Sequence, residues 1–140
     1  MALVQKSNPI NEDYAIAVIQ THLYSNLLSL GVTNYESYER VYVINGSPEI
    51  YIGANNYKEV FYDNRFYLTS FFVLGNNKRK VDEYVYEVDL SIVFQANLTK
   101  LYPTITHRAD AELHHDINNA LEGIPADFEI IEIVTGIDNV

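Results

Sequence analysis

The sequence predicts an α+β fold, with a single, mostly antiparallel β-sheet, a long central hairpin and two helices packed on one face of the sheet. The stretch from Tyr84 to Phe94 alternates large apolar residues with other residues over eleven positions, which is typical of a half-buried strand. One helical pattern precedes the strand-rich middle of the chain and another follows it. This order favours one sheet with the helices gathered on one side.

The first helix is predicted to run from Asn11, as the N-cap, to Leu30, and Gly31 is expected to end it. Apolar residues recur there at intervals of three or four, which is the spacing of one helix face. They are Ile16, Ile19, Leu23, Leu27 and Leu30. Residues 1–10, which precede the helix, are interpreted as an N-terminal arm.

Turn-forming residues divide the middle of the chain into four further strands, predicted at Arg40–Ile44, Glu49–Ile52, Tyr57–Tyr62 and Phe66–Leu74. The last of them is apolar on both faces, so both faces are expected to be covered. Residues 75–80 are predicted to form the polar tip that joins it to Tyr84–Phe94 in a long antiparallel hairpin. Leu90 and Ile92 should be buried against the helices, facing Leu23, Leu27 and Leu113.

The end of the chain is predicted to contain a second helix and a last strand. The helix runs from about His107 to Leu121 and is ended by Gly123. The strand runs from Phe128 to Thr135. Together with the preceding elements, the 140 residues are expected to form one domain.

The composition excludes several function classes. The formal net charge is −10, so generic binding to the phosphate backbone of a nucleic acid is not expected. The chain has no cysteine, which excludes disulfides, thiolate metal sites and cysteine nucleophiles. No stretch approaches the roughly twenty apolar residues of a membrane span, and the start lacks the apolar core of a signal peptide. A cytoplasmic protein without membrane association is therefore expected.

One cluster of side chains near the second helix has metal-binding chemistry: His107, Asp110, Glu112, His114, His115 and Asp116. Imidazole and carboxylate groups bind zinc and other transition metals. The i, i+4 histidine pair and the H-E-x-x-H motif of helical zinc sites are both missing, so a solvated helix face is the favoured interpretation. Glu87 and Asp89 have the spacing of paired carboxylates but are interpreted as the polar face of a strand. We therefore expect no catalytic residue, no metal and no cofactor.

The order of elements resembles that of tail terminator and tail-completion (neck) proteins of long-tailed bacteriophages, the group typified by the lambda terminator. The resemblance is carried by the helix at residues 12–30, the strand Y-V-Y-E-V-D-L-S-I-V-F, the second helix H-R-A-D-A-E-L-H-H-D-I-N-N-A-L, and the closing strand after G-I-P. Family members usually have a further C-terminal strand. The sequence after Thr135 offers none, so either that strand is absent or a neighbouring subunit supplies it.

The resemblance implies a non-enzymatic virion structural protein. Such subunits form a ring, commonly a hexamer, that caps the tail tube and joins it to the head connector. Their partners are therefore other copies of the same chain, the tail tube protein and the head-connector or neck proteins. The ring is assembled in the host cytoplasm and becomes part of the virion tail or neck, where DNA passes through its lumen without specific binding.

The hairpin is the expected contact between subunits of such a ring. Two helices cover only one face of the sheet, so the other face of Phe66–Leu74 would expose an apolar patch, and such patches mark interaction sites. The acids Glu87 and Asp89 are expected to face the lumen, where negative charge repels passing DNA. The expected interface residues are Tyr67, Phe71, Val73, Lys78, Arg79 and Lys80, of which the three basic ones would meet acidic groups of the next subunit or of the tail tube.

Two other hypotheses stay open. The chain could be a standalone α+β protein- or ligand-binding module, which would be monomeric or dimeric. It could also be a metal-dependent hydrolase that uses the cluster around His107, which would carry stoichiometric metal. Oligomeric state and metal content separate these hypotheses from the ring-forming subunit.

Overall fold

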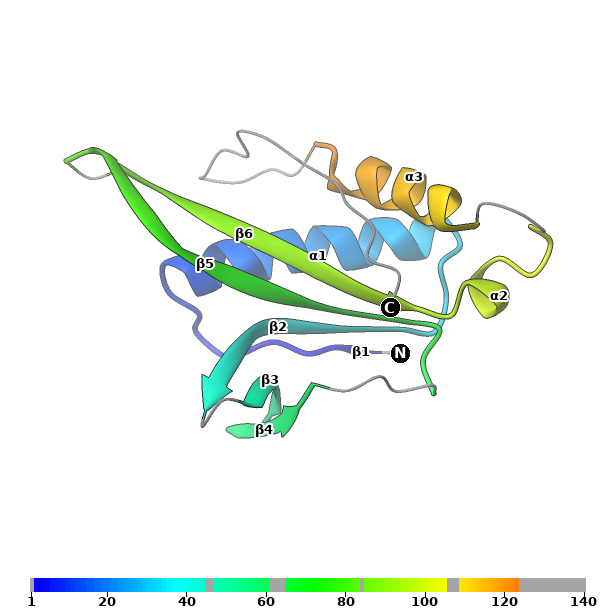
Figure 1. Ribbon diagram of the computed structural model, residues 1–140, viewed down its shortest axis with the longest axis horizontal. Coiled ribbons are helices and arrows are strands. Elements are labelled where there is room, and N and C mark those ends of the chain that lie inside the picture. The colour runs from blue at the N-terminus through cyan, green and yellow to red at the C-terminus, as the bar shows by residue number, and fades with distance from the viewer. Residues whose placement is uncertain (1, 45–46, 61–64, 84, 106–108, 124–140) are drawn as a thin grey trace.

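The computed structural model describes residues 2–44, 47–60, 65–83, 85–105 and 109–123. Its helices are α1 (Glu12–Ser29), α2 (Leu98–Leu101) and α3 (Ala109–Leu121). Its strands are β1 (Ala2–Leu3), β2 (Tyr35–Ile44), β3 (Ser47–Gly53), β4 (Asn56–Glu59), β5 (Leu68–Asp82) and β6 (Val85–Ala96). Figure 1 shows α1 and α3 on one side of the sheet and the β3–β4 hairpin on the other.

The strands form one mixed sheet in the order β4-β3-β2-β5-β6, and β1 pairs with β2 beside this path. The β2–β3, β3–β4 and β5–β6 pairs are antiparallel, whereas β1–β2 and β2–β5 are parallel. The predicted α+β fold is therefore confirmed. The predicted centre of the sheet is wrong, because β2 and β5 occupy the middle. Strand β6, which contains the alternating stretch, lies at an edge in the described part of the chain.

Strand β2 begins five residues before the predicted strand. The prediction missed its first half because the polar side chains there interrupt the apolar alternation, although they are buried. Ser37 is 0% and Glu39 is 1% exposed. The Tyr35 hydroxyl forms a hydrogen bond of 2.5 Å with Ser70 Oγ, and burial raises the pKa of Tyr35 to about 12. Gln20 of α1 donates from Nε2 to the Ser37 carbonyl at 3.1 Å. Such bonds offset the cost of burying polar groups.

Helix α1 ends as the sequence predicts. Gly31 has φ +94° and donates its N–H to the Leu28 carbonyl at 3.1 Å, while Val32 donates to the Leu27 carbonyl at 3.0 Å. This pair of bonds satisfies the last carbonyls of the helix in the Schellman arrangement. At the other end Asn11 occupies the predicted N-cap position, but its side chain makes no capping hydrogen bond.

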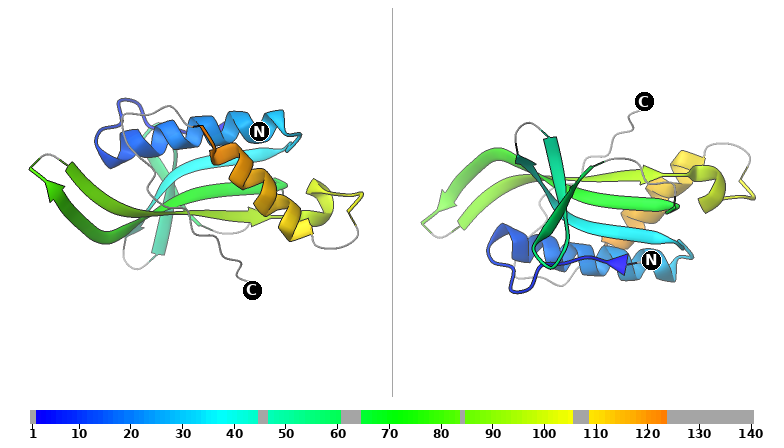
Figure 2. Two further views of the ribbon diagram at one scale, coloured as in Figure 1. Left: turned by 90° about the horizontal axis from the view of Figure 1, so that it is seen from above. Right: turned by 90° about the horizontal axis from the view of Figure 1, so that it is seen from below.

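The helix-side core lies between the two long helices and the sheet. Its buried residues are Ile16, Ile19, Leu23, Leu27, Val32, Tyr35, Leu68, Phe72, Leu113 and Ala120. Ile92 packs against the group that includes Leu23, Leu27 and Leu113, as predicted, and Leu90 packs against the group around Phe72. Both β6 residues are only half-buried, which fits the edge position of that strand. Figure 2 shows α3 crossing over α1 and the sheet.

The face opposite the helices is partly covered by the β3–β4 hairpin, which forms part of the connection between the parallel strands β2 and β5 (Figure 2, right). Tyr38, Ile50 and Phe71 are buried there together, and Val4, Val41, Val60 and Val93 pack against them. The expected exposure of Phe71 is therefore wrong, because its side chain is 8% exposed. Parallel neighbours require a crossover connection, and here the crossover supplies the second cover of β5.

Strands β5 and β6 form the long predicted hairpin, but residues 75–80, the predicted polar tip, belong to β5. Pairing runs from Leu68 opposite Ala96 to Asp82 opposite Val85, with register shifts between Leu74 and Lys78 and between Lys80 and Asp82. Gly75 lies at the first shift, where an added Cβ would be 3.0 Å from the Cβ and the carbonyl oxygen of Asp89. Gly75 therefore marks a β-bulge with close backbone approach rather than a turn.

The start of the chain differs from the prediction. The segment predicted as an N-terminal arm lies along the sheet, with Ala2 opposite Glu36 and Leu3 opposite Ser37. The short helix α2 was not predicted. The predicted last strand, Phe128–Thr135, lies outside the described residues.

Candidate interaction surface on the hairpin

The β5–β6 hairpin extends beyond the rest of the sheet. Strand β2 pairs with β5 only as far as Phe72. From Gly75 to Asp82, β5 pairs only with β6 in the described part of the chain. We call these eight β5 residues, together with β6 residues 85–89, the hairpin arm. At about 3.3 Å per residue the arm is roughly 25 Å long, and Figure 1 shows it projecting past the start of α1.

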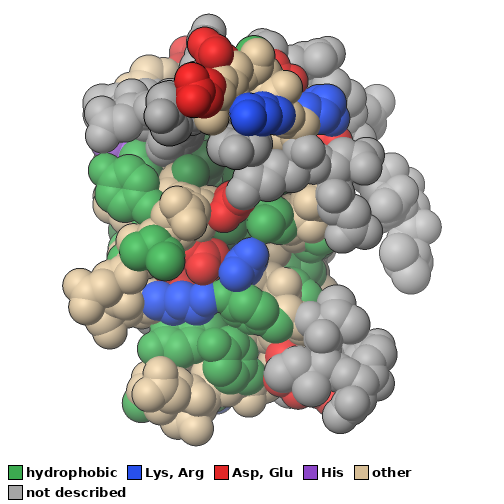
Figure 3. All heavy atoms as spheres, turned by 90° about the vertical axis from the view of Figure 1, so that its left-hand side faces the viewer, with side chains coloured by type: hydrophobic (Ala, Val, Ile, Leu, Met, Phe, Trp, Pro, Cys, Tyr) green, Lys and Arg blue, Asp and Glu red, His purple; other side chains and the backbone are tan. Residues whose placement is uncertain are grey.

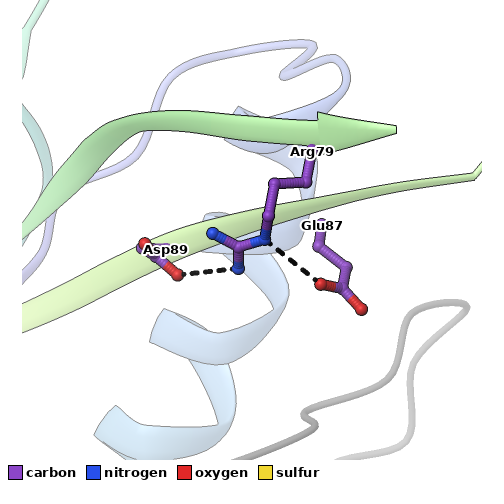
Figure 4. A network of polar contacts seen from close by, with 3 residues as sticks. All are labelled: Arg79, Glu87 and Asp89. Carbon is purple, nitrogen blue, oxygen red and sulfur yellow. Dashed lines mark hydrogen bonds and ion pairs between the residues drawn. The ribbon is translucent and has the colours of Figure 1, made fainter. Parts of the chain in front are cut away.

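An ion-pair network joins the two strands of the hairpin arm (Figure 4). Arg79 Nη2 donates to Asp89 Oδ1 at 3.2 Å and Arg79 Nε donates to Glu87 Oε2 at 3.4 Å. The hydrogen bond and charge of Asp89, followed by those of Glu87, raise the pKa of Arg79. All three side chains are substantially exposed, at 53%, 35% and 60% for Arg79, Glu87 and Asp89. Exposed pairs of this kind stabilise a fold only slightly.

This network unites two sets of residues that the sequence assigned to different surfaces. Arg79 was expected at the subunit interface, whereas Glu87 and Asp89 were expected to face a lumen. In the structure one guanidinium contacts both carboxylates, so the three charges partly neutralise one another and face the same side of the arm. Over the whole arm, three basic residues stand against three acidic ones. The arm is thus close to neutral on a chain whose formal charge is −10.

The other expected interface residues are spread along β5. Phe71 is buried under the β3–β4 hairpin. Val73, two residues further on the same face, is 39% exposed. Tyr67 immediately precedes β5 and is half-buried, and the Lys100 ammonium lies 5.6 Å from its ring centroid. Lys80 is exposed on the arm, and the backbone of Lys78 pairs with Val88, while the side chain of Lys78 lies outside the described part.

A second polar cluster lies where α1 begins beside β2. Asp13 forms ion pairs with Lys6 Nζ at 3.4 Å and with Arg40 Nε at 2.9 Å. The Tyr42 ring lies close to both cations, with Lys6 Nζ 4.3 Å and Arg40 Cζ 4.7 Å from its centroid. Figure 3 looks onto this end of the molecule and shows basic, acidic and hydrophobic side chains interspersed rather than a surface of one sign.

Glu39 lies within this second cluster and is the most deeply buried carboxylate among the described residues. Neither of its carboxylate oxygens has a well-aligned hydrogen-bond partner, although the backbone N–H of Lys6 is close enough to lower its pKa. Burial raises the pKa of Glu39, and the nearby charge of Asp13 raises it further, while Lys6 and Arg40 oppose the shift. The cluster therefore combines Asp13, which is shared by two cations, with a buried carboxyl group whose pKa is raised.

The histidine cluster does not assemble into a recognisable site. His115 is exposed and its Nε2 lies 3.1 Å from Asn119 Nδ2, and His114 is half-buried on the same helix. Asp116 accepts a hydrogen bond of 2.7 Å from the Tyr102 hydroxyl. Within the described residues no group of three histidine or carboxylate side chains is placed to hold a metal ion; His107 lies outside them.

Comparison with known proteins finds no match. No family model, no curated protein and no solved structure corresponds to this chain. Among the described helices, none is long and apolar enough to cross a bilayer. The function is therefore inferred from the residues of this chain alone.

Sequence reasoning missed two features of these surfaces. The first is the Arg79 network, which forms only because β5 and β6 both extend far enough to bring Arg79 opposite Glu87. Gly75 and the two asparagines after it are typical of a turn, and they hid the continuation of β5 into Lys78–Lys80. The second is the contact of Lys6 with α1, which depends on the N-terminal residues folding back along β2 and leaves no periodic pattern.

Proposed function

We propose that the chain is a non-enzymatic structural subunit of a bacteriophage virion, a tail terminator or related neck component. Its copies form a ring that caps the tail tube and joins it to the head connector. The observation that carries this proposal is the hairpin arm. It projects from the sheet, it is nearly neutral on an acidic chain, and among the described residues few contacts other than its own strand pairing hold it.

A two-stranded ribbon in water is marginally stable by itself. Beyond Leu74 and Leu90, which lie opposite each other, the arm is held among described residues mainly by its own strand pairing and the exposed Arg79 network. Val81 of the arm is 57% exposed. A neighbouring subunit packed against the arm would bury this apolar surface and stabilise the ribbon, which favours an assembling subunit over a monomeric binding module.

The charge distribution supports the same choice of contact. Two copies with a formal charge of −10 each repel one another over most orientations. The arm, with three basic and three acidic residues, is a place where two copies meet with little repulsion. Contacts that repeat head-to-tail close into a ring when the rotation between neighbours closes. The order of helix, long hairpin and helix that resembles tail terminators is the reason for placing the ring in a phage tail.

Light scattering of wild type against two matched variants tests this proposal. Val81→Asp adds a charge to the exposed arm, and Ile52→Asp adds one to β3, where the side chain is 41% exposed. Both substitutions lie at exposed sites and should change stability little. We expect a ring-sized mass for wild type and Ile52→Asp, and subunits or small oligomers for Val81→Asp. A monomeric wild type at high concentration would contradict the proposal and favour the binding module. Phe71 is unsuitable as a probe because a charge there would disrupt the core.

A further inference from the structure

We propose that residues 2–6, here called the N-terminal segment, exchange between two copies of this chain. Each segment would then lie against β2 and α1 of the other copy. The inference rests on how the segment is bound and on the conformation of residues 7–11, which connect it to α1. It does not depend on the proposed function, because none of these residues belongs to the hairpin arm.

The segment is bound mainly by hydrogen bonds, and the segment of a second copy has the same donors and acceptors. It adds a parallel strand to the edge of β2, with Leu3 opposite Ser37, and the Val4 N–H donates to the Ser37 carbonyl at 2.9 Å. Gln20, which is fully buried, donates from Nε2 to the Val4 carbonyl at 3.0 Å and to the Ser37 carbonyl at 3.1 Å. One side chain thus holds the segment and β2 together.

Side chains of the segment complete the attachment to α1. Gln5 Nε2 donates to the Ala17 carbonyl at 3.1 Å and to Thr21 Oγ1 at 2.9 Å. Lys6 forms an ion pair with Asp13 at 3.4 Å. Val4 is the segment's contribution to a buried apolar cluster. Every one of these contacts joins the segment to residues beyond the connection, so an identical segment from a second copy makes the same set.

The connection holds two residues in unfavourable backbone conformations. Asn8 has φ +56° although it precedes Pro9, and a residue before proline favours an extended backbone with negative φ. Asn11 has φ +53° and ψ −123°, outside the regions that residues with a side chain normally occupy. Its side chain makes no capping bond that would offset this strain. A short connection under strain favours exchange, because extending it releases the strain while the contacts are kept.

A disulfide test is possible because the chain has no cysteine of its own. Leu3→Cys with Ser37→Cys places two thiols on register partners of neighbouring strands. Such strands are about 4.8 Å apart, within the range of roughly 4.4–6.8 Å over which a disulfide joins two Cα atoms. The reduced double variant is unfolded, refolded at low and at high protein concentration, and oxidised. We expect intrachain disulfides at low concentration and covalent dimers, seen on non-reducing gels, at high concentration.

The control variant removes the backbone strain from the connection between the N-terminal segment and α1. Adding Asn8→Gly and Asn11→Gly lets both positions adopt positive φ without cost, so the association constant of the dimer should fall by at least about tenfold. Val81→Asp on the hairpin arm should leave the crosslinking unchanged, even where it abolishes larger assemblies. Intrachain disulfides alone at every concentration would overturn the exchange.

If the cysteine variant fails to fold, two charge-reversal variants test the exchange of the N-terminal segment instead. Lys6→Glu alone places like charges opposite Asp13 within one copy, and Asp13→Lys alone places them opposite Lys6. Exchange between the two variants restores opposite charges at both sites. Refolding equal amounts of the two together should give a mixed dimer by native mass spectrometry, at clearly more than the twofold ratio over either homodimer that random pairing produces. Refolded mixtures that contain only monomers, or no excess of the mixed dimer, would overturn the inference.

Discussion

Truncation of Phe71 tests whether the β3–β4 hairpin covers the second face of the sheet. Phe71→Ala removes a ring that is 8% exposed and packed with Tyr38 and Ile50. The neighbouring residue on the same face, Val73, is 39% exposed and supplies the control, Val73→Ala. If the hairpin covers this face, the two truncations should differ strongly in their effect on stability.

The magnitude follows from the burial. Phenylalanine-to-alanine changes in a core cost about 3–5 kcal/mol. Phe71 is not completely buried, and its neighbour on the same face, Val73, is exposed. We therefore expect Phe71→Ala to cost about 3 kcal/mol, near the lower end of that range. For 140 residues, at about 2.1 cal/mol/K of unfolding entropy per residue, this lowers Tm by roughly 10 °C. Val73→Ala removes a smaller, partly exposed side chain and should cost less than about 1 kcal/mol.

Urea denaturation followed by circular dichroism measures both free energies of unfolding, and Phe72→Ala, on the helix side, serves as the reference for a fully buried ring. We expect Phe71→Ala to lie close to Phe72→Ala and far from Val73→Ala. If Phe71→Ala instead costs no more than Val73→Ala while Phe72→Ala remains costly, the hairpin does not cover this face, and the apolar patch first expected from the sequence is exposed after all.

Two further changes test other parts of the structure. Burial raises the pKa of Glu39 above its usual 4.5, so the folded chain holds a proton that the unfolded chain loses, and stability should decline as pH rises above 4.5. Glu39→Gln should lack this part of the decline in a pH series of urea titrations, and identical pH slopes would refute the burial argument. Gly31→Ala forces a side chain into φ +94° and should cost about 1 kcal/mol; an unchanged Tm would show that α1 ends differently.

The sequence predicted those elements whose residues carry their own signal. The apolar spacing of α1 and the glycine after it placed the helix to within one residue at its C-terminal end. The alternation from Tyr84 to Phe94 located β6. The arm was shortened in the prediction because Gly75 and two asparagines are typical of turns, whereas here the register shift at Gly75 lets the strand continue through them.

Features that depend on long-range pairing were not predictable in this way. The first half of β2 contains Glu36, Ser37 and Glu39, whose polarity indicates a loop. Only the folded structure shows that Gln20 and Ser70 form hydrogen bonds with Ser37 there. The parallel pairing of β2 with β5 has no local pattern. Phe71 could not be assigned to a core because its cover, the β3–β4 hairpin, reaches it only through the crossover. Of the expected interface residues, Phe71 is buried, whereas Val73, Arg79 and Lys80 are exposed.

Electron microscopy of the purified chain, alone and mixed with isolated phage tail tubes, tests the central claim most directly. We expect closed rings of wild type, with the same rings seated on the ends of the tubes, and neither rings nor capped ends with Val81→Asp. Isolated single subunits and bare tube ends with the wild-type chain would contradict the claim that this is a ring-forming tail subunit.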